Sequence, residues 1–350
     1  MNNFKLITLS LAATVALSMT GCGGSDTTTA PTTTPTVAPA TSVEVDCSNV
    51  TYEIPSSLTL SGDISTNTHL TADKIWSLDG LVKIKGGTCL KIDPGTTIAS
   101  PKGKNFMVVL KNAKIIAEGT AAAPIIFTTD TNVTGPGEWG GLTILGNAPT
   151  NQTNPYYEVD EADPDFAFGG TDANSNSGVL KYVHVLNSGY EVNTGLEING
   201  LSLCGVGAGT TISDIIVKNS SDDGIEVWGG TVNMNNLYIE DALDDSLDMD
   251  FGYTGNVTNV TVLQNAIAFS GFEISSGGNS PMTSPTIRNF TITKTNTLSV
   301  DGGIYIKDDT TAPTFIDGNV TVTDNDSGIF VKQVMTDAQK STMKFGDVTL

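Results

Sequence analysis

Short hydrophobic segments recur along the chain and alternate with polar, turn-forming segments. Within many of them Val, Ile and Leu occupy every second position, and clusters of Gly, Asn, Asp and Thr separate them. Neighbouring side chains on a β-strand point to opposite faces, so this pattern predicts strands that bury one face. A helical period of about 3.6 residues is nearly absent. The chain is therefore predicted to be all-β.

The second half of the chain contains a repeated tripeptide in which two apolar residues flank a middle residue. Successive copies begin 29, 22, 25, 32 and 25 residues apart. The copies are Leu196-Glu197-Ile198, Ile225-Glu226-Val227, Leu247-Asp248-Met249, Phe272-Glu273-Ile274, Ile304-Tyr305-Ile306 and Ile329-Phe330-Val331. A sandwich or a propeller would not produce this spacing, whereas a solenoid in which each coil pairs with the next would.

A second set of strands keeps the same spacing. It comprises Ile212 to Val217, Val257 to Val262 and Ile287 to Ile292. Short polar residues recur at one bend between strands, where the backbone needs local hydrogen bonds or a left-handed residue. They are Asp214, Asn236, Asn259 and Asn289. Two strands in each repeat of 22 to 32 residues, with insertions at the turns, predict the coils of a parallel β-helix.

The first half carries weaker repeats of the same kind. They are Cys89 to Thr96, Val108 to Leu110, Ile115 to Thr120 and Pro124 to Phe127. Together with Gly137 to Leu142, Phe168 to Asp172 and Asp222 to Gly224, these segments resemble a family of bacterial surface lipoproteins. The resemblance extends from about Thr71 to Gln264. It implies a single-stranded right-handed parallel β-helix, with the hand that parallel connections generally prefer. It implies no particular activity, because the family's members are largely uncharacterised.

The predicted β-helix domain occupies residues 46 to 350, and a long loop interrupts it at residues 146 to 178. This loop is polar and acidic, and it carries the aromatic residues Tyr156, Tyr157, Phe166 and Phe168. Loops of this length are usually functional or disordered. Two interpretations are open, namely a flap that covers one face of the coils and a loop that binds a ligand.

Residues 1 to 21 are predicted to be a secretory signal peptide. Lys5 supplies a positive charge, and Leu6 to Met19 form an apolar stretch that is too short to span a bilayer. The order Met19-Thr20-Gly21-Cys22 resembles the lipobox of bacterial lipoproteins. This resemblance implies that Cys22 is acylated and becomes the mature N-terminus. A cleaved signal followed by an unmodified Cys is the alternative.

Residues 22 to 45 are rich in Thr and Pro and are predicted to form a flexible tether. They cannot bury enough apolar surface to offset their conformational entropy. Gly23, in place of Asp, favours sorting to the outer membrane by resemblance to Gram-negative lipoproteins. The expected location is the cell envelope, as an outer-membrane lipoprotein held through its lipid, with the periplasmic and outer faces both open.

The chain is strongly acidic, with 38 Asp and Glu against 17 Lys and Arg and a net charge of -21. This charge repels nucleic acid, which is therefore excluded as a partner, and it favours cations. Cys47 and Cys89 flank the first part of the predicted domain and are expected to form a disulfide in an oxidising compartment. Cys204 lies in an apolar segment and is expected to be a buried thiol.

The middle residues of the repeated tripeptides predict a column of carboxylates. Because the flanking apolar residues face the interior, the middle residues point outward and stand above one another. They are Glu197, Glu226, Asp248 and Glu273. Neighbouring coils are about 4.8 Å apart, so adjacent carboxylates repel by about 3 kcal/mol at an effective dielectric near 20. Such a column is expected to need compensation.

A bound cation is the predicted compensation, because Lys and Arg are absent between Lys218 and Arg288. Ca²⁺ takes six to eight oxygen ligands in loose geometry. The predicted ligands are Asp222, Asp223, Glu226, Asp244, Asp245, Asp248 and Asp250. Pectate lyases, which bind Ca²⁺ on such a face, are similar in architecture only. A solvated acidic face without metal is the alternative.

Trp228 is predicted to project outward beside these carboxylates. It would offer a platform on which a sugar stacks, with Glu197 and Glu273 as further ligand-binding residues. Alternatively, Trp228 covers the turn formed by Gly229-Gly230.

The leading prediction is a non-catalytic envelope lipoprotein that binds Ca²⁺ and attaches to glycans or surface proteins, so no catalytic residue is assigned. The alternative is a carbohydrate-active hydrolase or lyase. A lyase needs a basic residue, which the acidic coils lack, whereas an inverting hydrolase needs two carboxyl groups about 6.5 to 9.5 Å apart. Asp222-Asp223 with Asp244-Asp245 would meet that need. Asp222-Asp223-Gly224 resembles a polygalacturonase motif, but that family's Gly-His-Gly is missing.

Overall fold

The computed structural model describes residues 44 to 132, 135 to 266, 268 to 295, 302 to 308, 311 to 322, 329 to 331 and 344 to 349. The described residues all lie in one compact unit, Ser42–Leu350. The predicted signal peptide, Cys22 and the tether as far as residue 43 lie outside the described residues. Among the described residues, no helix is long and apolar enough to span a membrane.

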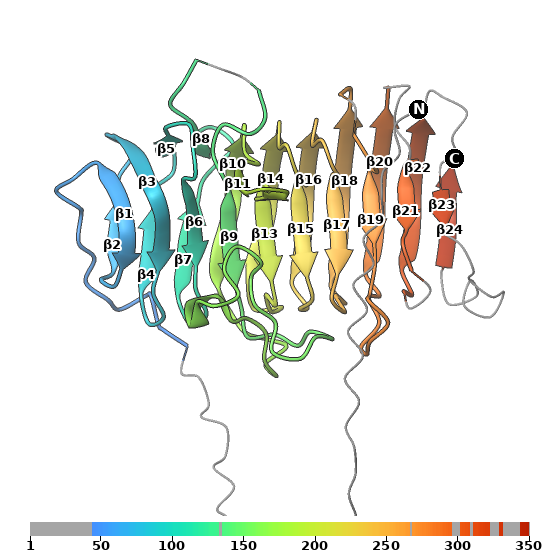
Figure 1. Ribbon diagram of the computed structural model, residues 1–350, viewed down its shortest axis with the longest axis horizontal. Coiled ribbons are helices and arrows are strands. Elements are labelled where there is room, and N and C mark those ends of the chain that lie inside the picture. Colours follow the sequence, from blue (N-terminus) through green and yellow to red (C-terminus); the bar gives the residue numbers. More distant parts are fainter. Residues whose placement is uncertain are drawn as a thin grey trace, which may run out of the picture. The chain divides into compact units, whose positions relative to one another are not determined.

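The described residues form coils of parallel strands, and successive coils lie side by side (Figure 1). The first stack of strands consists of β1 (Thr59–Ile64), β3 (Ile75–Ile84), β6 (Phe106–Val109), β9 (Leu142–Leu145), β13 (Leu201–Cys204), β15 (Ile225–Trp228), β17 (Leu247–Asp250), β19 (Phe272–Ile274), β21 (Ile304–Ile306) and β23 (Ile329–Val331). Each strand in this stack pairs in parallel with the next one named. The predicted all-β parallel β-helix is confirmed.

The second stack forms another side of the coils. It consists of β2 (Thr68–Leu70), β4 (Cys89–Ile92), β5 (Thr97–Ser100), β7 (Lys114–Glu118), β8 (Ile125–Thr129), β10 (Gly178–Leu186), β14 (Thr211–Lys218), β16 (Asn233–Glu240), β18 (Asn256–Gln264), β20 (Thr286–Lys294), β22 (Thr314–Val322) and β24 (Lys344–Thr349). The long strand β10 pairs with both β7 and β8, so it replaces two short strands of the earlier coils.

The register of the first stack places like residues above one another. Ile225 pairs with Leu247, and Leu247 pairs with Phe272, and all three side chains are fully buried in the core. The pairing continues through β21 to β23, so five of the six predicted tripeptides align as expected. Burial of these apolar columns is the main favourable contribution to folding.

The prediction for Leu196-Glu197-Ile198 is wrong. Leu196–Glu197 is strand β12, which pairs in antiparallel fashion with β11 (Glu191–Asn193) in a small hairpin outside both stacks. The coil strand is instead β13, in which Ser202 lies opposite Glu226. Its sequence Leu-Ser-Leu-Cys has the same apolar-polar-apolar order as the repeat, which is why the pattern alone did not separate the two segments.

The predicted polar bend is confirmed in the second stack. Asp214, Asn236, Asn259 and Asn289 all have left-handed backbones, with φ between 52° and 59°. Each side chain also bonds to the next: the amide of Asn236 donates to Asp214 at 2.9 Å, and that of Asn259 donates to Asn236 at 2.8 Å. Short polar side chains tolerate this conformation, so the ladder turns each long strand at the same place.

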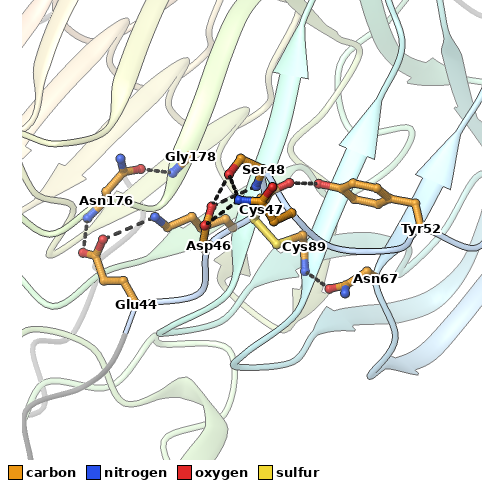
Figure 2. Close-up of a disulfide and its surroundings, with 11 residues drawn as sticks. Glu44, Asp46, Cys47, Ser48, Tyr52, Asn67, Cys89, Asn176 and Gly178 are labelled. Carbon is orange, nitrogen blue, oxygen red and sulfur yellow. Dashed lines mark hydrogen bonds and ion pairs between the residues drawn. A yellow bond between two sulfur atoms is a disulfide. The ribbon is translucent and has the colours of Figure 1, made fainter.

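Cys47 and Cys89 form a disulfide that ties the entering segment to β4 (Figure 2). Nearby, the carboxylate of Glu44 accepts a hydrogen bond from the backbone N–H of Asn176 at 2.6 Å and contacts Lys114 at 3.3 Å. The N-terminal segment is therefore bound to two distant parts of the β-helix. Cys204 is a fully buried thiol.

Candidate functional site

The loop at residues 146 to 178 packs against the first stack, and we call it the flap. Its aromatic residues Tyr157, Phe166 and Phe168 are at most 3 % exposed. The ring centroid of Trp228 lies 5.5 Å from that of Tyr157 and 6.0 Å from that of Phe168. Trp228 is therefore 7 % exposed and buried under the flap, so the prediction of an exposed sugar platform is wrong. The side chain does leave the coil interior, but it enters a second core.

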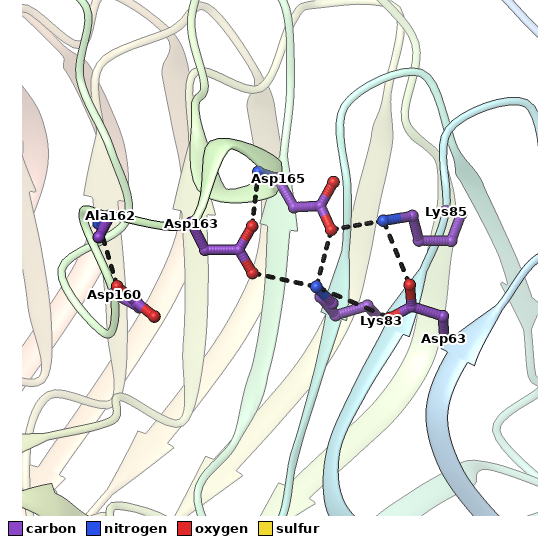
Figure 3. A network of polar contacts seen from close by, with 7 residues as sticks. All are labelled: Asp63, Lys83, Lys85, Asp160, Ala162, Asp163 and Asp165. Carbon is purple, nitrogen blue, oxygen red and sulfur yellow. Dashed lines mark hydrogen bonds and ion pairs between the residues drawn. The ribbon is translucent and has the colours of Figure 1, made fainter.

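Ion pairs hold the flap to strand β3 (Figure 3). Lys83 contacts Asp165 at 2.7 Å and Asp163 at 3.0 Å, and Lys85 contacts Asp63 at 3.4 Å as well as Asp165. Asp163 also caps the short 3₁₀ helix η1 (Pro164–Phe166). The hydrogen bonds from Lys83 and Lys85 lower the pKa of Asp165. We call these five residues the flap clamp.

An acidic pocket of about 400 Å³ lies on the first stack, and Glu158 of the flap contributes to its wall. Its lining residues are Glu158, Asn199, Asp222, Asp223, Glu226, Asp244, Asp245, Asp248, Phe269, Glu273, Tyr305 and Lys307. The Asp-Asp pairs come from the turns before β15 and β17, and Glu226, Asp248 and Glu273 come from the strands. The pocket therefore collects side chains from successive coils and from the flap.

Six of the seven predicted metal ligands line this pocket, whereas Asp250 does not. One carboxylate oxygen of Asp250 instead accepts the backbone N–H of Phe251 at 2.5 Å. Of the predicted ligand-binding residues, Glu273 lines the pocket. Glu197 lies in the hairpin and lines a neighbouring hollow of about 240 Å³ with Asp222 and Asp244. The expected column of carboxylates thus runs from Glu226 through Asp248 to Glu273, without Glu197.

Side chains in the turns also form a structural ladder. Asn199 accepts the backbone N–H of Asp223 at 3.2 Å, Asp223 accepts that of Asp245 at 2.8 Å, and Asp245 accepts that of Ser270 at 2.6 Å. One oxygen of each Asp is therefore used to fix the next coil. The Asp residues of the turns therefore have a structural role, which accounts for part of the acidic repeat without a bound ligand.

Two further contacts relieve the repulsion in the column. The amide of Asn199 donates to Glu226 at 2.5 Å, and Lys307 pairs with Glu273 at 2.5 Å. Sequence reasoning missed Asn199, Lys307 and the flap residue Glu158. Asn199 and Lys307 directly follow two of the repeated tripeptides, but the search there was for carboxylates, and Glu158 lies far from the repeats along the chain. For Glu158 the available signal was the polar, acidic character of the flap, and for Asn199 and Lys307 it was their position beside the repeat.

Burial raises the pKa of the pocket's carboxyl groups. The pKa of Glu158 is raised to about 7 by burial and then by the charge of Asp222. The pKa of Asp222 is raised to about 7 by burial and then by Asp244 and Glu197. Burial and the neighbouring carboxylates also raise the pKa values of Asp223, Glu226, Asp245 and Asp248. The charged forms of these groups are therefore disfavoured in the pocket unless a cation offsets their charge.

Two groups of three carboxylates have the spacing of metal ligands. In each group, one oxygen from every residue lies within 4.8 Å of the others. The groups are Asp222, Asp223 and Asp244, and Asp223, Glu226 and Asp248. Ca²⁺ to oxygen distances are about 2.3 to 2.6 Å, so two ligands of one ion lie at most about 5 Å apart. The residues present therefore fit the predicted ion.

The chain is similar to one protein family and, in fold, to solved structures of tailspike proteins. The model of the pectate-lyase-like β-helix domain matches residues 62–350. The enzymatically active domain of tailspike protein 2 of bacteriophage CBA120 is 11 % identical with a TM-score of 0.37, over 81 % of this chain and 37 % of that chain. The Dettilon tailspike protein is 14 % identical with a TM-score of 0.32, over 76 % of this chain and 62 % of that chain.

The chain spans less than two thirds of either tailspike chain. A comparison with curated proteins finds no match. The family model, in contrast, covers most of the chain, including every residue of the acidic pocket. The protein belongs to the pectate-lyase-like β-helix domain family.

Proposed function

We propose that the acidic pocket binds a polysaccharide and hydrolyses its glycosidic bonds. One observation carries this proposal: Glu158 of the flap and Asp222 of the coil line one pocket, and each has a pKa of about 7. At neutral pH each group is then ionised in about half of the molecules, so states with one protonated and one ionised carboxyl group are well populated. A glycosidase needs this combination of general acid and general base. Membership of a pectate-lyase-like family supports a carbohydrate as the substrate class.

Hydrolysis fits the pocket better than elimination. A lyase needs a neutral basic side chain that removes a proton, and Lys307 is the one basic residue among those that line the pocket. Burial alone would lower the pKa of Lys307, but the hydrogen bond with Glu273 raises it above its ordinary value. Lys307 therefore stays protonated and is unsuited to act as a base.

The test is turnover of a panel of neutral, acidic and amino polysaccharides, scored for new reducing ends and for unsaturated products. We expect reducing ends without unsaturation. Glu158→Gln should lower the rate by about 10² to 10⁴, the usual contribution of a general acid or base. Asp214→Asn is the matched control, since Asp214 lies in the ladder of the second stack. Unsaturated products, or full activity in Glu158→Gln, would refute the proposed mechanism.

A second candidate function is Ca²⁺ binding without catalysis. It is favoured by the two groups of three carboxylates and by Asp248, whose Oδ1 is buried without a hydrogen-bond partner among the described residues. A ligand that binds only the folded state at 100 times its Kd stabilises that state by about 2.7 kcal/mol. Millimolar Ca²⁺ should then raise the melting temperature of the wild type but not of Asp248→Asn. A rise without turnover of any polysaccharide would favour this candidate over hydrolysis.

We also propose that the protein is an outer-membrane lipoprotein, anchored through acylated Cys22, that meets glycans or surface proteins at the cell envelope. The support is the sequence of residues 1 to 45 alone. Buried acyl chains contribute about 0.8 kcal/mol per CH₂, so several chains anchor a protein firmly. Cys22→Ser should therefore release the protein into the soluble fraction. Unchanged membrane fractionation of Cys22→Ser would rule out this anchor.

A further inference from the structure

The acidic pocket holds more acidic groups than one acid and base pair uses. Eight of its lining residues carry carboxyl groups, and Lys307 is the one basic residue among them. Lys307 is already paired with Glu273 at 2.5 Å. The carboxyl groups of the lining therefore outnumber its basic side chains by seven. A neutral sugar needs only a few of these acceptors for its hydroxyl groups, and an anionic sugar would be repelled.

Asp248 supplies an acceptor atom in the pocket lining that no donor among the described residues satisfies. Its side chain lies between Glu226 and Glu273 in the strand register and is 9 % exposed. Its Oδ1 atom is buried and has no hydrogen-bond partner among the described residues. A buried acceptor without a donor is costly, so this atom is suited to a donor that the ligand brings.

The shape of the pocket fits an organic chain. Its lining residues come from coils between β13 and β21, which are four steps apart. At about 4.8 Å per step, the lining extends roughly 19 Å along the β-helix. This length accommodates several sugar rings and exceeds the coordination sphere of one metal ion. Phe269 also lines the pocket and is 46 % exposed, so it offers an aromatic face to a sugar ring.

We propose that the substrate is a glycan whose sugars carry free amino groups, such as a de-N-acetylated hexosamine polymer, and that Asp248 binds one of these ammonium groups. The inference rests on the proposed function and adds the substrate class. An ammonium group brings three N–H donors and a positive charge, which match the unpaired oxygen and the surplus of carboxylates. An N-acetylated sugar of the same size brings one amide donor and no charge.

The test is calorimetric binding of a glucosamine tetramer, with the N-acetylglucosamine tetramer of the same linkage as the matched ligand. The chain is used with Cys22→Ser so that it remains soluble. We expect the free-amine tetramer to bind and Asp248→Asn to weaken that binding by roughly 30-fold or more, the effect of removing one member of a buried charge pair. Asp214→Asn should bind like the wild type. Added Ca²⁺ should compete with the tetramer.

Three outcomes would overturn the inference: equal binding of the two tetramers, tighter binding of an oligogalacturonate, or full affinity in Asp248→Asn. The proposed hydrolysis would survive these results if Glu158→Gln still lost turnover of another polysaccharide. Conversely, tight binding of the glucosamine tetramer without cleavage would support the ligand class and refute the hydrolysis.

Discussion

The flap clamp and the acidic pocket are two clusters of acidic residues that differ in how far basic side chains compensate their charge. In the clamp, Lys83 and Lys85 contact Asp63, Asp163 and Asp165, so nearly every charge has a partner. In the pocket, eight carboxyl-bearing residues share Lys307. The pKa of Asp165 is accordingly lowered, whereas the pKa of Asp222 is raised to about 7. Paired charges indicate a structural role, whereas the surplus of carboxyl groups over basic side chains in the pocket is the feature on which the proposed ligand site rests.

The largest expected effect is on the pH dependence of stability. Groups with raised pKa values stabilise the folded state at low pH, and this stabilisation is lost as the pH rises through the folded-state pKa. For Glu158 the window runs from its ordinary pKa of 4.5 to about 7. The shift corresponds to roughly 3 kcal/mol as an upper limit, because water at the pocket mouth screens the charge.

The measurement is the free energy of unfolding of the wild type and Glu158→Gln at about pH 4.5 and pH 7.5, without divalent cations. The stability of Glu158→Gln relative to the wild type should rise with pH. The clamp should behave oppositely, because the lowered pKa of Asp165 contributes stability that is lost on acidification. A relative stability of Glu158→Gln that falls with pH would contradict the assignment of a raised pKa.

The clamp substitution should have an intermediate effect. Asp165→Asn removes the carboxylate that contacts both Lys83 and Lys85, so the folded protein should lose about 1 to 2 kcal/mol at pH 7. Asp160→Asn is a matched control in the same flap, because within the described part of the chain its side chain bonds only the nearby backbone N–H of Ala162. Denaturant titration of both variants checks the difference. Equal stability of the two variants would show that the clamp contributes nothing.

The smallest effect is expected at Asp248, a buried carboxyl group of the pocket. Burial raises the pKa of Asp248, so the charged form of this carboxyl group is disfavoured, and Asn has nearly the same shape as the neutral form. Asp248→Asn should therefore change the free energy of unfolding by less than about 1 kcal/mol, which is small for a buried polar site. A loss as large as that of Asp165→Asn would show that Asp248 has a structural partner.

The strand register was predictable because the apolar, acidic, apolar order of three tripeptides repeats with the coils. Ile225, Leu247 and Phe272 could be assigned to the core from that order alone. The same pattern gave a wrong assignment at Glu197, because the sequence of a hairpin there has the same alternation as the repeat. Local sequence does not distinguish an insertion from a coil when both contain alternating residues.

The composition of the pocket was only partly predictable. The carboxylates of the coils follow from the repeat, but contacts with the flap determine the surroundings of these carboxylates. It buries Trp228 and brings Glu158 to the pocket, and both effects depend on contacts between segments about 70 residues apart along the chain. Lys307 likewise reaches Glu273 from a later coil. Such contacts leave no periodic signal in a single sequence.

The most direct test of the central claim compares one carboxylate from each cluster. Asp222 lines the pocket and Asp63 belongs to the clamp, so Asp222→Asn and Asp63→Asn make the same chemical change at two sites. The measurement is the initial rate at which each variant releases reducing ends from the polysaccharide that the wild type cleaves. We predict that Asp222→Asn loses about 10² to 10⁴ of the rate and that Asp63→Asn stays within about twofold of the wild type. Equal rates for the two variants would contradict the account.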